Sequence, residues 1–294
     1  MGSSNHITGV RIPAHARVYL TFDVIDKEYG QKDNACIMAK LDLHDMLDIR
    51  ITRRKSGKCV NAPKEIDHLG LWKAAASQFA MGYGLDGEVN IQVNRQVPHG
   101  WDLGEEESIA AAVLRALAIL HQVPQNESFH ELSRGLHPQV EFFVQDHDMI
   151  GSAGYGKPMV PMNNVPPIEV VLANPRVDHP PYLARRGVYN LVTSARASSW
   201  AEDKEQENAP HALAESSIGQ SISSSHAIVP RHALQIEDVV AVMRRYDGCR
   251  GAAILGPGRG VIGFYTNSAA ANNAAMDLRI KNYDTEVTRI KRPR

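Results

Sequence analysis

The chain is poor in cysteine and has no long hydrophobic run. Its three cysteines, Cys36, Cys59 and Cys249, are far apart in 294 residues and form no C-x-x-C pair. This spacing argues against a disulfide framework or a zinc site and favours isolated thiols in a reducing compartment. Because no run of about 18 apolar residues occurs, we expect no transmembrane helix. The first residues also lack a hydrophobic signal region, so we expect a cytoplasmic protein without a membrane partner.

Charge of either sign is not in excess. The 32 Lys and Arg residues nearly balance the 33 Asp and Glu residues, which leaves a formal net charge of -1. Without a basic field we expect no nucleic-acid partner. The 13 histidines contain no H-E-x-x-H pattern, so no metal site is predicted from them. The length allows one large domain or two.

Apolar periodicity predicts the elements of the first half of the chain. Alternation of apolar and polar residues predicts strands over 11–24 and 88–95, with two more over 37–43 and 48–52 on either side of a turn at His44 and Asp45. Helical spacing predicts helices over 69–81, 105–121 and 128–135, and the apolar run Val140–Val144 is interpreted as a strand.

The second half follows a stretch rich in Gly and Pro, 151–167, which we interpret as turns between two halves. Beyond it the pattern predicts strands over 169–173, 251–255, 260–265 and 286–290 and helices over 236–246 and 268–280. For the Ser- and Glu-rich segment 195–227, a helix and a mobile insertion both remain open. The order of elements predicts two α+β domains, residues 1–160 and 161–294.

The most informative stretch leads from the strand 88–95 through Pro98 and Gly100 into the helix 105–121. A helix that starts after a glycine turn is a natural anion site, because unpaired N–H groups and the helix dipole point there. Here three glutamates, Glu105–Glu107, occupy the first turn, where they favour the helix start and would repel a triphosphate. Three interpretations stay open: an acidic turn that stabilises the helix, a divalent-cation cluster, and a phosphate-binding loop.

Six stretches together resemble the GHMP small-molecule kinases. They are Pro13-Ala14, Leu41–Asp45, Pro98–Leu117, Val140–Phe143, Val170–Pro175 with Val188-Tyr189, and Gly251–Gly263. Within that superfamily the chain is most similar to the kinases that phosphorylate a hydroxyl of a cytidine-diphosphate sugar alcohol in isoprenoid precursor synthesis. The resemblance implies a two-domain α+β fold whose ligand cleft lies between the domains, at the start of the helix 105–121. It also implies ATP with Mg²⁺ and a small-molecule substrate as partners.

The resemblance assigns site residues by position. His15 stands where the family's Pro-Ala-Lys-Ile-Asn segment has its lysine, and Gln139 stands at the catalytic aspartate of Gly-Ala-Asp-Val-Pro-Phe-Phe. Arg17, Gln31 and Lys32 occupy substrate-binding positions. The nucleotide loop is assigned to Pro98, His99, Gly100, Trp101, Asp102, Leu103, Gly104, Glu105, Glu106, Glu107 and Ser108.

Several of these positions carry residues other than the family's. Asp102 and the three glutamates replace glycines and a serine, the neutral amide of Gln139 cannot accept a proton, and His15 is cationic only when protonated. Each position also has a non-catalytic interpretation: His15 as a histidine of a strand without a catalytic role, and Gln139 as a side chain that only forms hydrogen bonds. We therefore expect little kinase activity. The alternative is an inactive or redesigned kinase-fold protein that acts as a binding or scaffold module.

Overall fold

The computed structural model describes residues 9–26, 32–52, 60–61, 70–83, 88–152, 159–161, 167–174, 234–255 and 260–292. The chain divides into two compact units. The first comprises Met1–Ala16, Leu43–Pro98 and Gly104–Asp146, and the second comprises Arg17–Asp42, His99–Leu103 and His147–Arg294. The segment 195–227 lies outside the described residues, and the domain boundary expected after residue 160 remains a prediction.

Two long strands, β1 (Gly9–Asp26) and β2 (Lys32–Thr52), pair with each other and contribute to both units. In the first unit, β2 runs antiparallel to β4 (Glu88–Asn94), and β3 (Val60–Asn61) lies parallel to β4 on its other side. The strands expected over 11–24 and 88–95 are confirmed.

The turn expected at His44 and Asp45 is wrong, because β2 continues through both residues. Asp45 is only 2% exposed, and its carboxylate accepts hydrogen bonds from two backbone amides that follow β4. A polar residue that finds such partners can lie in the middle of a strand, so its presence did not require a turn.

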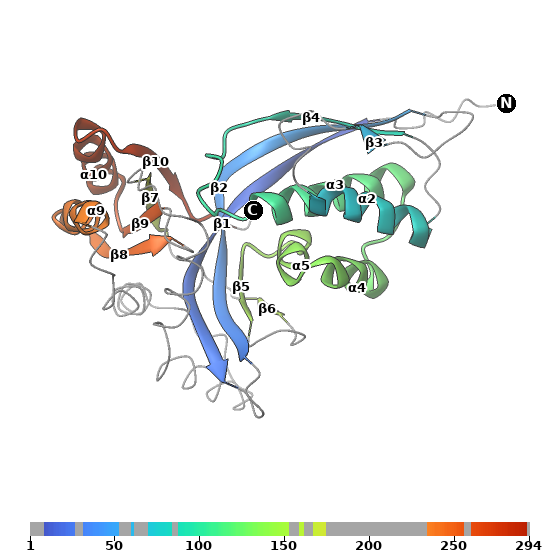
Figure 1. The fold of residues 1–294 in the computed structure, drawn as a ribbon, viewed down its shortest axis with the longest axis horizontal. Coiled ribbons are helices and arrows are strands. Elements are labelled where there is room, and N and C mark those ends of the chain that lie inside the picture. Colours follow the sequence, from blue (N-terminus) through green and yellow to red (C-terminus); the bar gives the residue numbers. More distant parts are fainter. Residues whose placement is uncertain are drawn as a thin grey trace. The chain divides into compact units, whose positions relative to one another are not determined.

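Four helices of the first unit lie on one side of these strands (Figure 1): α2 (Gly70–Tyr83), α3 (Glu105–His121), α4 (Glu127–Leu136) and α5 (Pro138–Val144). The central one is α3, which packs against α2 and α5 and buries most of its side chains. Its alanines allow close packing, since they bring little bulk to the contact. The helices expected over 69–81, 105–121 and 128–135 are confirmed.

The strand expected over Val140–Val144 is wrong, because these residues form most of α5. A run of five apolar residues fits a buried strand and a buried helix equally well. The residues before this run favour a helix. Pro138 occupies the first turn, where its missing N–H costs nothing, and the His137 side chain accepts a hydrogen bond from the Gln139 amide.

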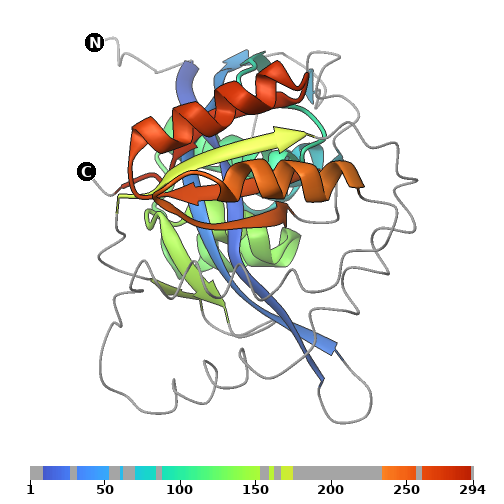
Figure 2. The same ribbon diagram turned by 90° about the vertical axis from the view of Figure 1, so that its left-hand side faces the viewer.

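The second unit contains an antiparallel sheet of four described strands in the order β10-β7-β9-β8. Its elements are β7 (Glu169–Asn174), α9 (Leu234–Arg244), β8 (Cys249–Leu255), β9 (Gly260–Tyr265), α10 (Ser268–Ile280) and β10 (Asp284–Arg289). Figure 2 shows α9 and α10 on one face of this sheet. The predicted elements of this half are confirmed.

Between that sheet and the two helices lies a core with one buried hydroxyl. Tyr265 is fully buried and donates a hydrogen bond of 2.9 Å to the Met243 carbonyl, and burial raises the pKa of the Tyr265 phenol. Burial also raises the pKa of the Cys249 thiol, which is free. A thiol with a raised pKa is less often the reactive thiolate, so Cys249 fits a packing role.

The C-terminal residues of the second unit attach to β2. Ile290 forms a bridge with Leu41, and the Lys291 amide donates to the Lys40 carbonyl at 2.8 Å. An ion pair joins Arg289 to Asp42. Nearby, β5 (Met149–Ser152) pairs with Cys36–Ala39 of β2 and with β6 (Met159–Pro161). The turns expected over 151–167 are therefore wrong at 151–152 and 159–161, which are strands.

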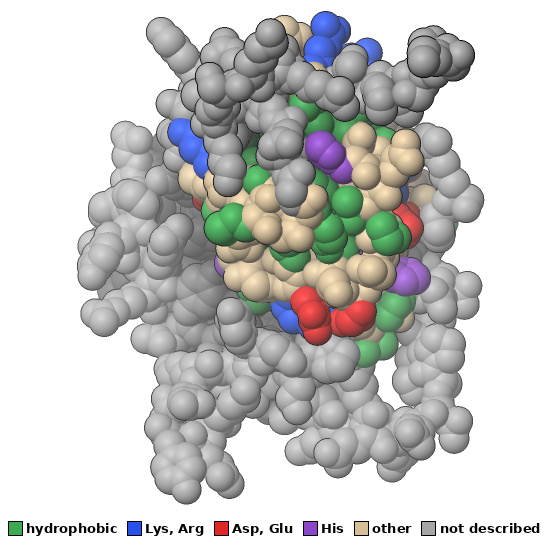
Figure 3. Space-filling view, turned by 90° about the vertical axis from the view of Figure 1, so that its right-hand side faces the viewer, with side chains coloured by type: hydrophobic (Ala, Val, Ile, Leu, Met, Phe, Trp, Pro, Cys, Tyr) green, Lys and Arg blue, Asp and Glu red, His purple; other side chains and the backbone are tan. Residues whose placement is uncertain are grey.

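A few large hydrophobic side chains are exposed on several elements, among them Met81 of α2, Ile119 of α3, and Met276 with Ile280 of α10. On the face drawn in Figure 3, described hydrophobic side chains lie among acidic side chains and histidines. Scattered exposure of this kind is ordinary for a protein surface. Among the described helices, none is long and apolar enough to cross a membrane.

The last turn of α3 makes folding stability sensitive to acid. The Nε2 atom of His121 is buried without a hydrogen-bond partner, its ring lies 6.0 Å from that of Phe79, and burial lowers the pKa of His121. Near and below pH 6.5, the ordinary pKa of histidine, the unfolded chain binds a proton at His121 more readily than the folded chain does. The free energy of unfolding should therefore fall as the pH falls through about 6.5.

We expect His121→Leu to lose less unfolding free energy than the wild type between pH 7 and pH 5 in urea titrations. The exposed His147→Asn is the control, and equal losses in His121→Leu and the wild type would contradict this account.

Candidate functional site

The loop that joins β4 to α3 is built on left-handed backbone. Gly100, Asp102 and Gly104 have φ values of 77°, 60° and 74°. Glycine adopts this region without the steric penalty that a Cβ brings. Gly104 precedes α3 and offers no side chain to cap it, and the first helical bond runs from the Ser108 amide to the Gly104 carbonyl at 2.9 Å. The chain therefore enters the helix with backbone amides at its start, as the sequence predicted.

The start of this loop is fixed by Asp45 of β2. Its Oδ1 accepts hydrogen bonds from the amides of Gln96 and Val97 at 2.7 and 2.8 Å. The guanidinium of Arg95 lies 3.8 Å from the other carboxylate oxygen. Further along, Trp101 and Leu103 are buried, so the loop is anchored by side chains as well as by Asp45.

The acidic first turn of α3 is tied to two neighbouring elements. Glu105 forms an ion pair with Arg95, which follows β4. Glu106 accepts a hydrogen bond of 2.9 Å from the amide of Leu71, in the first turn of α2. Both carboxylates are thus held by groups of the chain itself, Glu105 by a cation and Glu106 by a backbone amide. Within the described ranges no group of three or more potential metal ligands occurs, so nothing in the structure supports the divalent-cation interpretation.

The third glutamate faces α5. The Oε1 atom of Glu107 lies 4.0 Å from Nδ1 of His137, the residue that precedes Pro138. The same Nδ1 accepts the Gln139 amide at 3.3 Å. Gln139, the position predicted as catalytic in α5, therefore lies two positions after His137, which contacts the first turn of α3.

The other predicted catalytic position also meets this turn. The Ser108 hydroxyl donates a hydrogen bond of 2.7 Å to the backbone carbonyl of His15 in β1. The ring of His15 lies 5.0 Å from that of His44 in β2, with the ring planes tilted by 56°. Within the first unit, β1, α3 and the start of α5 thus bring together the segments that carry His15, Ser108 and Gln139.

The predicted substrate-binding residues are described only in part. Arg17 is 3% exposed, its guanidinium lies 4.0 Å from the centre of the Tyr19 ring, and its amide donates to the Leu103 carbonyl at 2.8 Å. Gln31 and the side chain of Lys32 lie outside the described residues. The substrate-binding role of all three remains a prediction.

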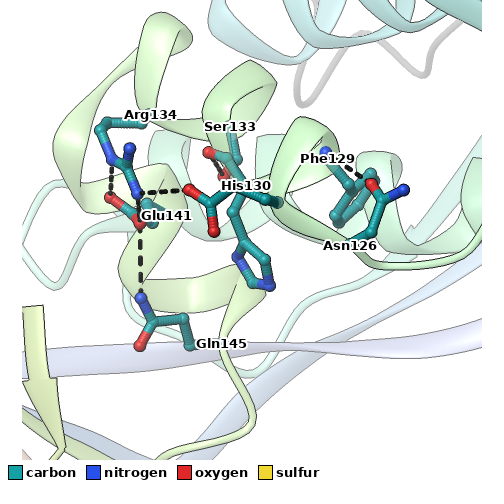
Figure 4. Close-up of polar contacts among 8 residues, drawn as sticks. Asn126, Phe129, His130, Ser133, Arg134, Glu141 and Gln145 are labelled. Carbon is teal, nitrogen blue, oxygen red and sulfur yellow. Dashed lines mark hydrogen bonds and ion pairs between the residues drawn. The ribbon is translucent and has the colours of Figure 1, made fainter.

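One ion pair that supports the site was not foreseen (Figure 4). Arg134 of α4 donates two hydrogen bonds to Glu141 of α5, at 2.9 and 2.7 Å, and these bonds raise the pKa of the Arg134 guanidinium. The Glu141 side chain is only 5% exposed. The pair braces the corner between α4 and α5. Its members are seven positions apart and Pro138 lies between them, so no helical spacing in the sequence indicated the pair.

No family model matches the chain, but known proteins and solved structures do. A 4-diphosphocytidyl-2-C-methyl-D-erythritol kinase of Anaeromyxobacter dehalogenans is 28% identical over 253 residues, which is 85% of this chain and 78% of that protein. Among solved structures, a 4-(cytidine 5'-diphospho)-2C-methyl-D-erythritol kinase aligns with a TM-score of 0.69 at 24% identity, covering 96% of this chain and 100% of the other. The chain is thus similar in sequence and in fold to kinases of the GHMP superfamily.

The fold is shared with superfamily members of other specificity. Homoserine kinase from Cytophaga hutchinsonii aligns with a TM-score of 0.70 at 15% identity and covers 99% of this chain and 97% of its own. The two-sheet α+β fold expected from the sequence is therefore confirmed. At such identities the fold alone does not fix the substrate, which has to be argued from the site.

Asp45 offers a test of how the loop is held. We expect Asp45→Ala to lower the free energy of unfolding by about 1–3 kcal/mol, because two amides lose their acceptor in a buried place. Asp48→Ala on the same strand is the matched control: Asp48 is 41% exposed and 3.8 Å from Arg11, and such surface pairs contribute about 0–1 kcal/mol. Equal losses for the two variants in urea unfolding would show that Asp45 does not anchor the loop.

Proposed function

We propose that this chain binds ATP at the start of α3 and phosphorylates a hydroxyl of 4-diphosphocytidyl-2-C-methyl-D-erythritol or of a related cytidine-diphosphate sugar alcohol. The observation that carries the proposal is the loop through Gly104, which delivers the first-turn amides of α3 without a capping side chain. Such an arrangement binds phosphate through backbone N–H groups and the helix dipole. The curated kinase relatives support the choice of substrate class.

The glutamates weaken this proposal less than their sequence suggests. Glu105 is paired with the positive charge of Arg95, and Glu106 is held by a hydrogen bond from the Leu71 amide, so the charge of Glu105 is offset locally and the carboxylate of Glu106 is directed toward α2. A compensated carboxylate repels a phosphate far less than a free one.

Magnesium would reach such a site together with the phosphates. Mg²⁺ usually keeps several waters and takes only one or two carboxylates beside the substrate phosphates. Glu107, which is 20% exposed and lies on the first turn, fits the role of a single carboxylate ligand. Bound there, the ion would neutralise charge on the transferring phosphoryl group.

The chemistry at positions 15 and 139 points to slow turnover. Phosphoryl transfer depends mainly on positioning and charge stabilisation, whereas a general base contributes about 10²–10⁴-fold. The neutral amide of Gln139 cannot serve as that base. It favours a second candidate function, nucleotide binding without transfer, in a protein that acts as a binding or scaffold module.

Binding is tested first, by isothermal titration with Mg-ATP. We expect a Kd below about 1 mM for the wild type. Gly104→Ala should weaken binding by about tenfold, because an alanine in the left-handed region costs about 1–2 kcal/mol and will reshape the loop. Gly135→Ala is the control, since a Cβ at Gly135 meets nothing within 4 Å. No detectable binding by the wild type would contradict both candidate functions.

Transfer is tested with 4-diphosphocytidyl-2-C-methyl-D-erythritol as acceptor and ³¹P NMR of the products. The proposal expects slow formation of a phosphomonoester by the wild type and a rate about 10²-fold higher for Gln139→Asp, which supplies a carboxylate base. ATP binding without product in either protein would favour the second candidate instead.

A further inference from the structure

Two histidines from neighbouring strands lie side by side in the first unit. His15 belongs to β1 and His44 to β2, and these strands pair with each other. The centres of the two imidazole rings are 5.0 Å apart, and the ring planes are tilted by 56°. Both residues are half-buried, so the rings are partly shielded from solvent. The pair brings two nitrogen-bearing rings together that are far apart in the sequence.

The separation of the rings matches the one that a shared tetrahedral ion requires. Zn²⁺ binds an imidazole nitrogen at about 2.0–2.1 Å, which places the ion about 3.2 Å from the ring centre. Two rings bound to one ion at the tetrahedral angle then have centres about 5.2 Å apart. The observed 5.0 Å is close to this value, so the two rings can share an ion without movement of either strand.

The tilt of the rings also fits a pair of ligands. Aromatic rings that only pack on each other prefer an offset parallel or a perpendicular arrangement. The tilt of 56° is neither. Rings that share an ion can turn about their nitrogen–metal bonds, so an intermediate tilt costs little there.

The backbone at both histidines is held by neighbouring elements. The carbonyl of His15 accepts a hydrogen bond of 2.7 Å from the Ser108 hydroxyl of α3. His44 precedes Asp45, whose carboxylate accepts hydrogen bonds from the amides of Gln96 and Val97. Ligands on backbone that is already ordered lose little conformational freedom when they bind an ion.

We propose that His15 and His44 form a binding site for a transition-metal dication of the Zn²⁺ class, through one ring nitrogen of each residue. Imidazole suits Zn²⁺, Cu²⁺ and Ni²⁺, whereas Mg²⁺ prefers oxygen ligands. Within the described residues no group of three potential ligands occurs, so the two histidines leave coordination positions for exchangeable water. An ion with such open positions accepts an oxygen of a small molecule, as in catalytic zinc sites. The inference does not depend on nucleotide binding.

The first arm of the test is isothermal titration of the full chain with ZnCl₂ at pH 7.5. The chain has 13 histidines and three cysteines, so the comparison between variants decides. We expect His15→Gln and His44→Gln each to weaken the binding of one equivalent of Zn²⁺ by at least about tenfold, because even changes outside the ligand shell cost about 10–100-fold. The double variant should lose no more than either single variant, since both residues serve one ion. The exposed His147→Asn is the control and should bind as the wild type does.

The second arm uses the wild type alone, so it decides even if a variant fails to fold. The ring resonances of His15 and His44 are followed by NMR while ZnCl₂ is added up to one equivalent, and then while MgCl₂ is added instead. We expect both rings to respond to Zn²⁺ together and neither to respond to Mg²⁺. Unchanged Zn²⁺ binding in both single variants, losses that add in the double variant, or a response of only one ring would overturn the inference.

Discussion

The first turn of α3 is the constraint on which the first unit depends. A left-handed Gly104 sets the entry of the chain, and the turn is then held by neighbours from different elements. These are Arg95 after β4, the Leu71 amide of α2, His137 before α5 and the His15 carbonyl of β1. Each contact uses a polar group that would be costly to bury alone, so the contacts support one another. The turn can move only if several of them break.

These contacts change how the glutamates are understood. In the sequence, three consecutive acids at a predicted phosphate loop favour either a simple helix start or electrostatic exclusion of a nucleotide. In the structure, Glu105 and Glu106 are bound by Arg95 and by the start of α2. Their charge is thus used within the fold. A chain with this fold can carry such residues and keep the backbone geometry of its loop, which is why we place nucleotide binding, and not its loss, first among the proposals.

Regular elements with a clear period could be predicted from the sequence. The helices over 105–121 and 268–280 were expected at the bounds that the structure shows, because long apolar spacing and defined starts agree there. Short or mixed sequence patterns led to wrong predictions. Val140–Val144 is too short to reveal a period, and the turn expected at Asp45 ignored acceptors that only the neighbouring strand supplies.

The candidate site also divides into features that the sequence predicts and features that only the structure shows. The glycine turn before α3 could be predicted from the sequence, whereas the site roles that the family resemblance assigns to His15 and Gln139 stay predictions. Arg95 and Arg134, whose partners lie on other elements, could not, because pairing across elements leaves no periodic signal. Contacts between polar residues that are far apart in the sequence are therefore what the tertiary structure adds to the prediction.

The claim that the acids of α3 act as internal ties is tested most directly by a double-mutant cycle on Arg95 and Glu105. Unfolding free energies of Arg95→Met, Glu105→Gln and the double variant give the coupling between the two side chains. The account predicts a coupling of about 1 kcal/mol or more, since the side chains are only 24% and 13% exposed. A coupling below about 0.3 kcal/mol would contradict it and would return the glutamates to the role of an unpaired acidic turn.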